Sequence, residues 1–201
     1  MFERVAALLK EDFCEKRGLP ACEVAIYQNH KELYRYSYGY NDLEKTEPLR
    51  PNSLYFLYSA TKPVTVTAAM RLIEEGKLSL DDEVAKYLPA YGKAFIEQDG
   101  KRIPIKNKML IRHLFTMTAG LDYFLNGEEL QAVLKQYGEK TTTRQIVDTF
   151  PLRPLHFEPG TRFEYSLCHD VLAAVIEVVS GISFGEYLSK IIFKPLAMTN
   201  S

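Results

Sequence analysis

The stretch from residue 167 to 179 constrains the fold of this chain more than any other. Its apolar side chains recur on nearly every side of a helix, and not along a single stripe. Such a helix is stable in water only when other elements surround it. The sequence therefore predicts a helix over 167–179 that is buried in a helical layer.

Further helices are predicted from apolar spacing and capping residues. Helical repeats of apolar residues end at Gly18 and at Gly76, where glycine favours a helix stop. Two capping boxes begin at Thr142 and Ser183, each with Gln or Glu three residues later. We expect helices at 5–17, 59–76, 79–88, 110–116, 142–150 and 183–193.

Two antiparallel hairpins are predicted from strand patterns that flank polar turns. The first joins 24–27 to 33–40 and places four tyrosines on one face, where core packing is their usual role. The second turns at Asp99-Gly100. The sequence thus predicts an α/β (α+β) fold with an antiparallel sheet, flanking helices and a helical region. We expect one domain over 1–201, with the first helix and the start of the sheet in 1–58 and the helical region in 59–193.

Composition excludes several classes of function. The formal net charge is −1, from 25 basic and 26 acidic residues, so no basic surface for nucleic acid or anionic lipid is indicated. Charges interrupt the apolar residues of the N-terminus, and the longest apolar run is far below the ~20 residues of a membrane span. We expect a cytoplasmic protein with no nucleic-acid or membrane partner. The three cysteines are Cys14, Cys22 and Cys168. Their odd number and the absence of metal-ligand spacing predict reduced, buried thiols, and we expect no metal and no cofactor.

A serine and a lysine three residues apart form the first candidate for chemistry. Ser59 precedes the helix whose first turn holds Pro63, and Lys62 lies one turn further on the same face. A serine hydroxyl becomes a nucleophile when a base removes its proton, and a buried lysine can be that base. The apolar segment 54–57 is predicted as a buried strand that supplies this burial. The alternative is a helix-capping serine beside a solvated lysine.

Tyr165 is the second candidate, because it lies where a loop meets the central helix. Its hydroxyl could move a proton between nucleophile and leaving group, whereas a tyrosine in the core is the alternative. Gly181-x-Ser183-x-Gly185 matches the nucleophile motif of α/β-hydrolases, but no histidine follows it and no strand precedes it. We interpret Ser183 as a helix cap.

The order of these motifs resembles the serine β-lactamase and penicillin-binding protein family, in the branch of class C β-lactamases, DD-peptidases and family VIII esterases. Ser59-Ala60-Thr61-Lys62 is similar to the Ser-x-x-Lys motif of the family. The segments 78–84, 111–121 and 159–166 are similar to later family signatures. The last of these resembles the segment that leads to the catalytic tyrosine of the family, at the position of Tyr165. The resemblance implies catalytic roles for Ser59, Lys62 and Tyr165.

The chain departs from the family pattern in two respects. Leu167 stands where the family often has an asparagine that binds the substrate amide, which favours an esterase. No Lys-Thr-Gly or His-x-Gly strand motif occurs in the 201 residues, so we expect the N-terminal part of a longer enzyme, without the C-terminal strands. An unpaired sheet edge would then permit self-association.

The sequence therefore predicts a serine hydrolase that forms an acyl-enzyme on Ser59 and acts on small esters or amides, with small esters favoured over β-lactams or peptides. The alternative is a catalytically impaired pseudoenzyme or binding module with the same fold.

Overall fold

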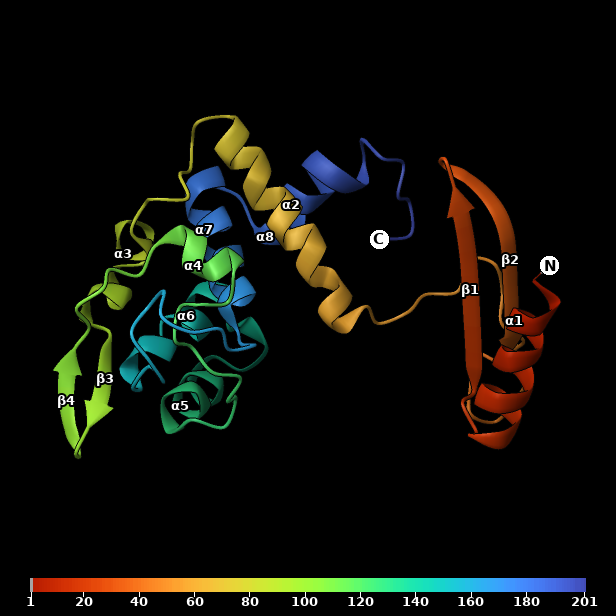
Figure 1. The fold of residues 1–201 in the computed structure, drawn as a ribbon, viewed down its shortest axis with the longest axis horizontal. Helices are drawn as coiled ribbons and strands as arrows, with labels where there is room; N and C mark the ends of the chain where they lie inside the picture. The colour runs from red at the N-terminus through yellow and green to blue at the C-terminus, as the bar shows by residue number, and fades with distance from the viewer. Residues whose placement is uncertain (1) are drawn as a thin grey trace. The chain divides into compact units, whose positions relative to one another are not determined.

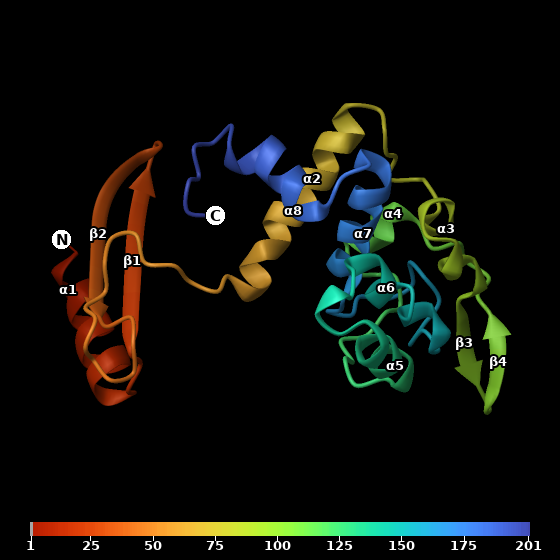
Figure 2. The same cartoon turned by 180° about the vertical axis from the view of Figure 1, so that it is seen from behind.

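The computed structural model describes residues 2–201, which divide into two compact units. One unit is the chain up to Phe56, and the other is Leu57–Thr199. Figure 1 shows the elements of both units, and Figure 2 shows them from behind. Both units contain helices and antiparallel strands, so the predicted mixture of α and β structure is confirmed.

The first unit is a helix packed on a hairpin, as predicted. Helix α1 (Glu3–Ala7) continues without interruption as a π-helical segment, Leu8–Lys16, and the chain turns at Gly18, whose φ is +73°. Strands β1 (Ala21–Gln28) and β2 (Lys31–Gly39) pair antiparallel. The Phe2 ring lies 5.1 Å from the ring of Tyr34, and the Tyr38 hydroxyl donates to Glu15 at 3.2 Å. One face of the hairpin is therefore covered by the helix.

A tight turn and a β-bulge together set the register of this hairpin. Asn29 and His30 have φ angles of +51° and +62°, which the two central residues of a type I′ turn require. The turn pairs Gln28 with Lys31, and an irregularity between Ile26 and Tyr27 then shifts the register so that Ile26 pairs with Tyr34. Strand alternation places the tyrosines of β2 on one face. All four predicted tyrosines are partly buried: Tyr34, Tyr36, Tyr38 and Tyr40.

The prediction of a buried strand over 54–57 is wrong. The segment forms no strand, and its side chains are exposed, with Phe56 89% accessible. An apolar segment becomes a strand only when a neighbouring strand accepts and donates its backbone hydrogen bonds. In the part of the chain that the structure describes, β1 and β2 pair only with each other. The strand that was expected to bury Lys62 is therefore not formed.

The second unit is built around α7 (Cys168–Ser180), which confirms the prediction of a buried central helix. Most of α7 is inaccessible to solvent, and it ends at Gly181 with φ +74°. Helix α2 (Thr61–Glu74) packs against it (Figure 1), with Ala68 and Ala69 fully buried. Because alanine is small, the two helices can approach closely and hold the start of α2 beside the start of α7.

The other elements of this unit surround α7. The hairpin at Asp99-Gly100 and the capping boxes of Thr142 and Ser183 are all confirmed. The helix expected from residue 79 begins only at 84, because the Asp82 carboxylate accepts the Ser79 N–H and closes a turn there. The elements are α3 (Val84–Tyr87), a 3₁₀ turn (Pro89–Lys93), β3 (Phe95–Gln98), β4 (Lys101–Pro104), α4 (Ile111–Phe115), α5 (Glu128–Tyr137), a 3₁₀ turn (Gly138–Lys140), α6 (Thr143–Val147), a 3₁₀ turn (Phe150–Leu152), α8 (Phe184–Leu188) and a π-helical segment (Ser189–Phe193).

Among residues 2–201, no single helix is both long enough and apolar enough to cross a membrane. Only α7 together with the helical segment 184–193 reaches that length, as a pair bent by 77°. Most of α7 is already covered by the protein core.

Candidate active site

The turn that carries Ser59 is set by an unusual backbone conformation. Tyr58 has φ +46°, a left-handed conformation that is uncommon for a bulky residue and is concentrated at functional sites. It begins the 3₁₀ turn Tyr58–Ala60, which leads directly into α2 with Pro63 in the first turn. Ser59 is therefore presented at the start of a four-turn helix.

The alternative role of Ser59 as a helix cap is not what the structure shows. Ala60 is the residue that precedes α2, and no side chain caps the helix there. The Ser59 hydroxyl instead lies 2.5 Å from the hydroxyl of Tyr165, and the Lys62 ammonium donates to it at 3.4 Å. The structure thus brings together the three predicted site residues, although Tyr165 is 106 positions away from Ser59.

These contacts change the acidity of the tyrosine. The pKa of Tyr165 is lowered, first by the hydrogen bond from Ser59 and second by Lys62. The Lys62 nitrogen lies 4.9 Å from the centre of the Tyr165 ring, so its positive charge favours a phenolate there. A phenolate this close to a serine hydroxyl can accept the serine proton.

Tyr123, which was not predicted from the sequence, completes the surroundings of Lys62. Its ring stacks on that of Tyr165, with the centres 5.7 Å apart and the planes 19° apart. The Lys62 nitrogen lies 5.7 Å from the centre of the Tyr123 ring. Nothing in the sequence marks this tyrosine, because it follows the 111–121 signature in a loop without regular spacing.

The site opens into a cavity of about 360 Å³ within the second unit. Burial lowers the pKa of His169, whose Nε2 lies 3.3 Å from the Phe115 carbonyl oxygen, so a neutral imidazole is favoured. Burial also raises the pKa of Asp170, although its side chain reaches solvent and Lys62 acts in the opposite direction. The cavity is lined by Tyr58, Ser59, Thr61, Lys62, Thr65, Tyr123, His169, Asp170, Ala173 and Phe184. A larger cavity, of about 760 Å³, is lined mainly by prolines and small residues, and no serine, threonine or cysteine is among the residues that line it.

Ser183 and His113 have structural roles. Ser183 accepts the Glu186 N–H and donates to the Glu186 carboxylate, so it caps α8 as interpreted from the sequence. His113 is half-buried, and its Nδ1 accepts the Leu110 N–H at 3.2 Å. Residues 2–201 contain no group of three or more His, Cys, Asp or Glu placed to hold a metal ion.

Residues 3–201 match the profile of the family described as Beta-lactamase. The chain belongs to the beta-lactamase family. Esterase EstB of Burkholderia gladioli is 33% identical to it over 210 residues, which are 97% of this chain and 50% of the relative. Protein flp of Staphylococcus aureus is 28% identical over 99% of this chain and 38% of its own length. The chain thus spans about half the length of the curated relatives it matches, or less.

Solved structures show that the fold is of the β-lactamase/transpeptidase type. EstCE1, described as a hydrolase with promiscuous acyltransferase activity, superimposes with a TM-score of 0.78 at 33% identity, over 97% of this chain and 51% of that chain. An octameric penicillin-binding protein homologue from Pyrococcus abyssi gives a TM-score of 0.77 at 26% identity, over 98% and 44%. The chain thus contains the N-terminal part of such a fold, as predicted from its sequence.

Proposed function

We propose that this chain carries the acyl-transfer centre of a serine hydrolase that cleaves small esters through an acyl-enzyme on Ser59. The observation that carries the proposal is the position of the Ser59 hydroxyl, 2.5 Å from Tyr165 and 3.4 Å from Lys62. A nucleophile, a proton acceptor and a cation that stabilises the acceptor's charged form are then within direct reach of one another.

The reaction follows from this geometry. Tyr165, ionised beside Lys62, takes the proton of Ser59 while the serine oxygen bonds to the ester carbonyl carbon. The tetrahedral intermediate collapses as the bond to the alcohol oxygen breaks, and the alcohol leaves with the proton from Tyr165. Water then repeats the sequence on the acyl-enzyme, releasing the acid and restoring Ser59. The start of α2 adds partial positive charge beside the developing oxyanion.

Esters are favoured over amides for two reasons. Leu167 is buried in the hydrophobic core, so this position places no polar group in the cavity to bind a substrate amide. The relatives EstB and EstCE1 are described as an esterase and as a hydrolase with acyltransferase activity.

A fluorophosphonate probe tests the proposal directly. The probe should label Ser59 and no other serine, because among the serines that the structure describes only Ser59 has a hydroxyl that contacts both a phenol and an amine. Labelling should vanish in Ser59→Ala and persist in Ser183→Ala, which removes only a helix cap. Peptide mapping by mass spectrometry gives the site. An unlabelled wild-type chain, or a label retained in Ser59→Ala, would overturn the proposal.

The exposure of the site favours a second candidate, a binding module or pseudoenzyme of the same fold. Tyr165 is 45% accessible, so water is not excluded from the reacting atoms in this structure. Such a protein would acquire the probe at Ser59 without turning over nitrophenyl esters. Repeated turnover of nitrophenyl acetate, measured beyond one equivalent of product per chain, would exclude it.

We also propose a cytoplasmic location, and the cysteines provide its test. Contrary to the sequence prediction, Cys14 and Cys22 are only half-buried, and their sulfurs lie 3.3 Å apart, whereas Cys168 is buried. In a reducing compartment all three should remain thiols, but an oxidising compartment should join the first two. Thiol blocking during lysis of the native host, followed by intact-mass measurement, should show three blocked cysteines. A Cys14–Cys22 disulfide, or recovery from the periplasm, would contradict this location.

A further inference from the structure

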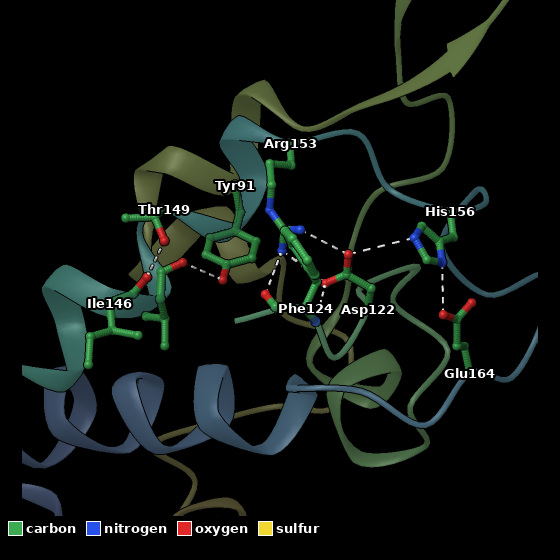
Figure 3. A network of polar contacts seen from close by, with 9 residues as sticks. Tyr91, Asp122, Phe124, Ile146, Thr149, Arg153, His156 and Glu164 are labelled. Atoms are coloured by element: carbon green, nitrogen blue, oxygen red, sulfur yellow. Dashed lines mark hydrogen bonds and ion pairs between the residues drawn. The ribbon is translucent and has the colours of Figure 1, made fainter. Parts of the chain in front are cut away.

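Each of the two stacked tyrosines directly follows a carboxylate, and one histidine lies between the two carboxylates. Asp122 precedes Tyr123, and Glu164 precedes Tyr165. His156 Nδ1 lies 2.8 Å from the Glu164 carboxylate, and its Nε2 lies 3.6 Å from that of Asp122. Figure 3 shows the imidazole between the two acids. His156 thus bridges the two loops that carry the tyrosines.

The Asp122 side of this bridge is held firmly. Arg153 donates to both oxygens of the Asp122 carboxylate, at 2.9 and 3.0 Å, and one oxygen also accepts the Phe124 N–H. Both side chains of this ion pair are about four-fifths buried. The Asp122 carbonyl oxygen accepts the Leu167 N–H, just before α7. Asp122 is therefore held in place by several contacts and can anchor the loop that carries Tyr165.

The Glu164 side depends on fewer contacts. The Glu164 N–H donates to the Met117 carbonyl, and its carboxylate meets His156. The His156 N–H in turn donates to the Gly120 carbonyl, which anchors the histidine to the segment leading to Asp122. The side chain of His156 is the direct link between the fixed Asp122 and the residue next to Tyr165.

We propose that His156 is a positioning residue that holds Tyr165 against Ser59 by linking Glu164 to Asp122. The proposal rests on the proposed function, since it concerns the geometry of the same site. Within residues 2–201, His156 touches neither Ser59 nor Lys62 through any contact described for it, so it acts through the loop. A displacement of about 1 Å at a reacting group can cost on the order of 10² in rate, so this link affects the reaction even though it lies outside the cavity.

The same geometry predicts a small effect on folding. The His156 side chain is about half exposed, and polar contacts between exposed side chains contribute little to stability. Removing the imidazole should therefore leave the second unit folded and change the Tyr165 loop. This separates a positioning role from a structural one.

The primary test is the acidity of Tyr165 in His156→Ala. With ¹³Cζ-labelled tyrosine, NMR should show the pKa of Tyr165 rising back toward its ordinary value, because the contacts that lower it depend on its position. Fluorophosphonate labelling of Ser59 should slow by about 10- to 100-fold. His156→Asn, whose amide nitrogen lies near the place of Nδ1, should keep the bond to Glu164 and recover part of both changes. An unmoved Tyr165 pKa in His156→Ala would overturn the proposal, whatever happens to the melting temperature.

A double-mutant cycle supplies the second test. Because His156 acts through Tyr165, His156→Ala should cost less than about 2-fold in labelling rate when Tyr165→Phe is already present. Lys108→Ala is the control, since it breaks an ion pair with Glu83 in the same unit and should change neither readout. Equal losses in both backgrounds would contradict the inference. Absence of label in the wild-type chain would instead refute the proposed function, and the NMR titration would still decide the role of His156.

Discussion

Lys62→Met is expected to slow the acylation of Ser59 by about 10³-fold, within the range of 10² to 10⁴ for a lost acid–base function. Methionine has nearly the same length as lysine and keeps the packing of α2, but it removes the ammonium group. That group donates to the Ser59 hydroxyl at 3.4 Å and lies 4.9 Å from the centre of the Tyr165 ring. Its loss removes one cause of the lowered pKa of Tyr165 and one hydrogen bond to the nucleophile.

The measurement is the burst of nitrophenol release, or the rate of fluorophosphonate labelling, at fixed pH. Lys86→Met is a matched control because Lys86 also lies over a tyrosine ring, at 5.0 Å from that of Tyr87, but outside the cavity. It should leave the rate unchanged. A loss of less than about 10-fold in Lys62→Met would show that the cation near Ser59 is not part of the acylation chemistry.

Ser59 and Lys62 could be found as candidates from the local sequence, because their positions depend on short-range rules. Ser59 and Lys62 are three residues apart at a helix start, and Pro63 fixes where that helix begins. The family resemblance then selected Tyr165, which no local rule distinguishes from a core tyrosine. The start of α8 at Ser183 was also predictable, since a capping box supplies hydrogen-bond partners for the first backbone groups of a helix.

The features that were predicted wrongly or not predicted depend on contacts between distant parts of the chain or on a pattern that was overlooked. Segment 54–57 is as apolar as a buried strand, but whether it is buried depends on neighbouring strands that its own residues do not encode. Tyr123 contacts Tyr165 and His156 contacts Asp122, partners that lie far away along the chain, so no spacing reveals these two residues. Helix α5 was not predicted, although its sequence has apolar residues at helical spacing, namely Leu130, Val133, Leu134 and Tyr137.

Tyr165→Phe should reduce the acylation rate by about 10²- to 10⁴-fold, since it removes only the hydroxyl that lies 2.5 Å from Ser59. Phenylalanine keeps the ring that stacks on Tyr123, so the loop should stay in place. Tyr187→Phe is the control, because the Tyr187 hydroxyl is buried without a hydrogen-bond partner among the described residues and its removal should not slow acylation.

The pH dependence of acylation identifies which group takes the serine proton. If the phenolate of Tyr165 is the base, the rate rises with pH through the pKa of Tyr165 and levels off above it. Because Ser59 and Lys62 lower that pKa, the rise should occur below the usual tyrosine range. Lys62→Met should move the rise to higher pH, since one lowering contact is lost, and Tyr165→Phe should abolish it. A rise that persists unchanged in Tyr165→Phe would assign the proton transfer to the Lys62 amine instead, with Tyr165 left to position the nucleophile.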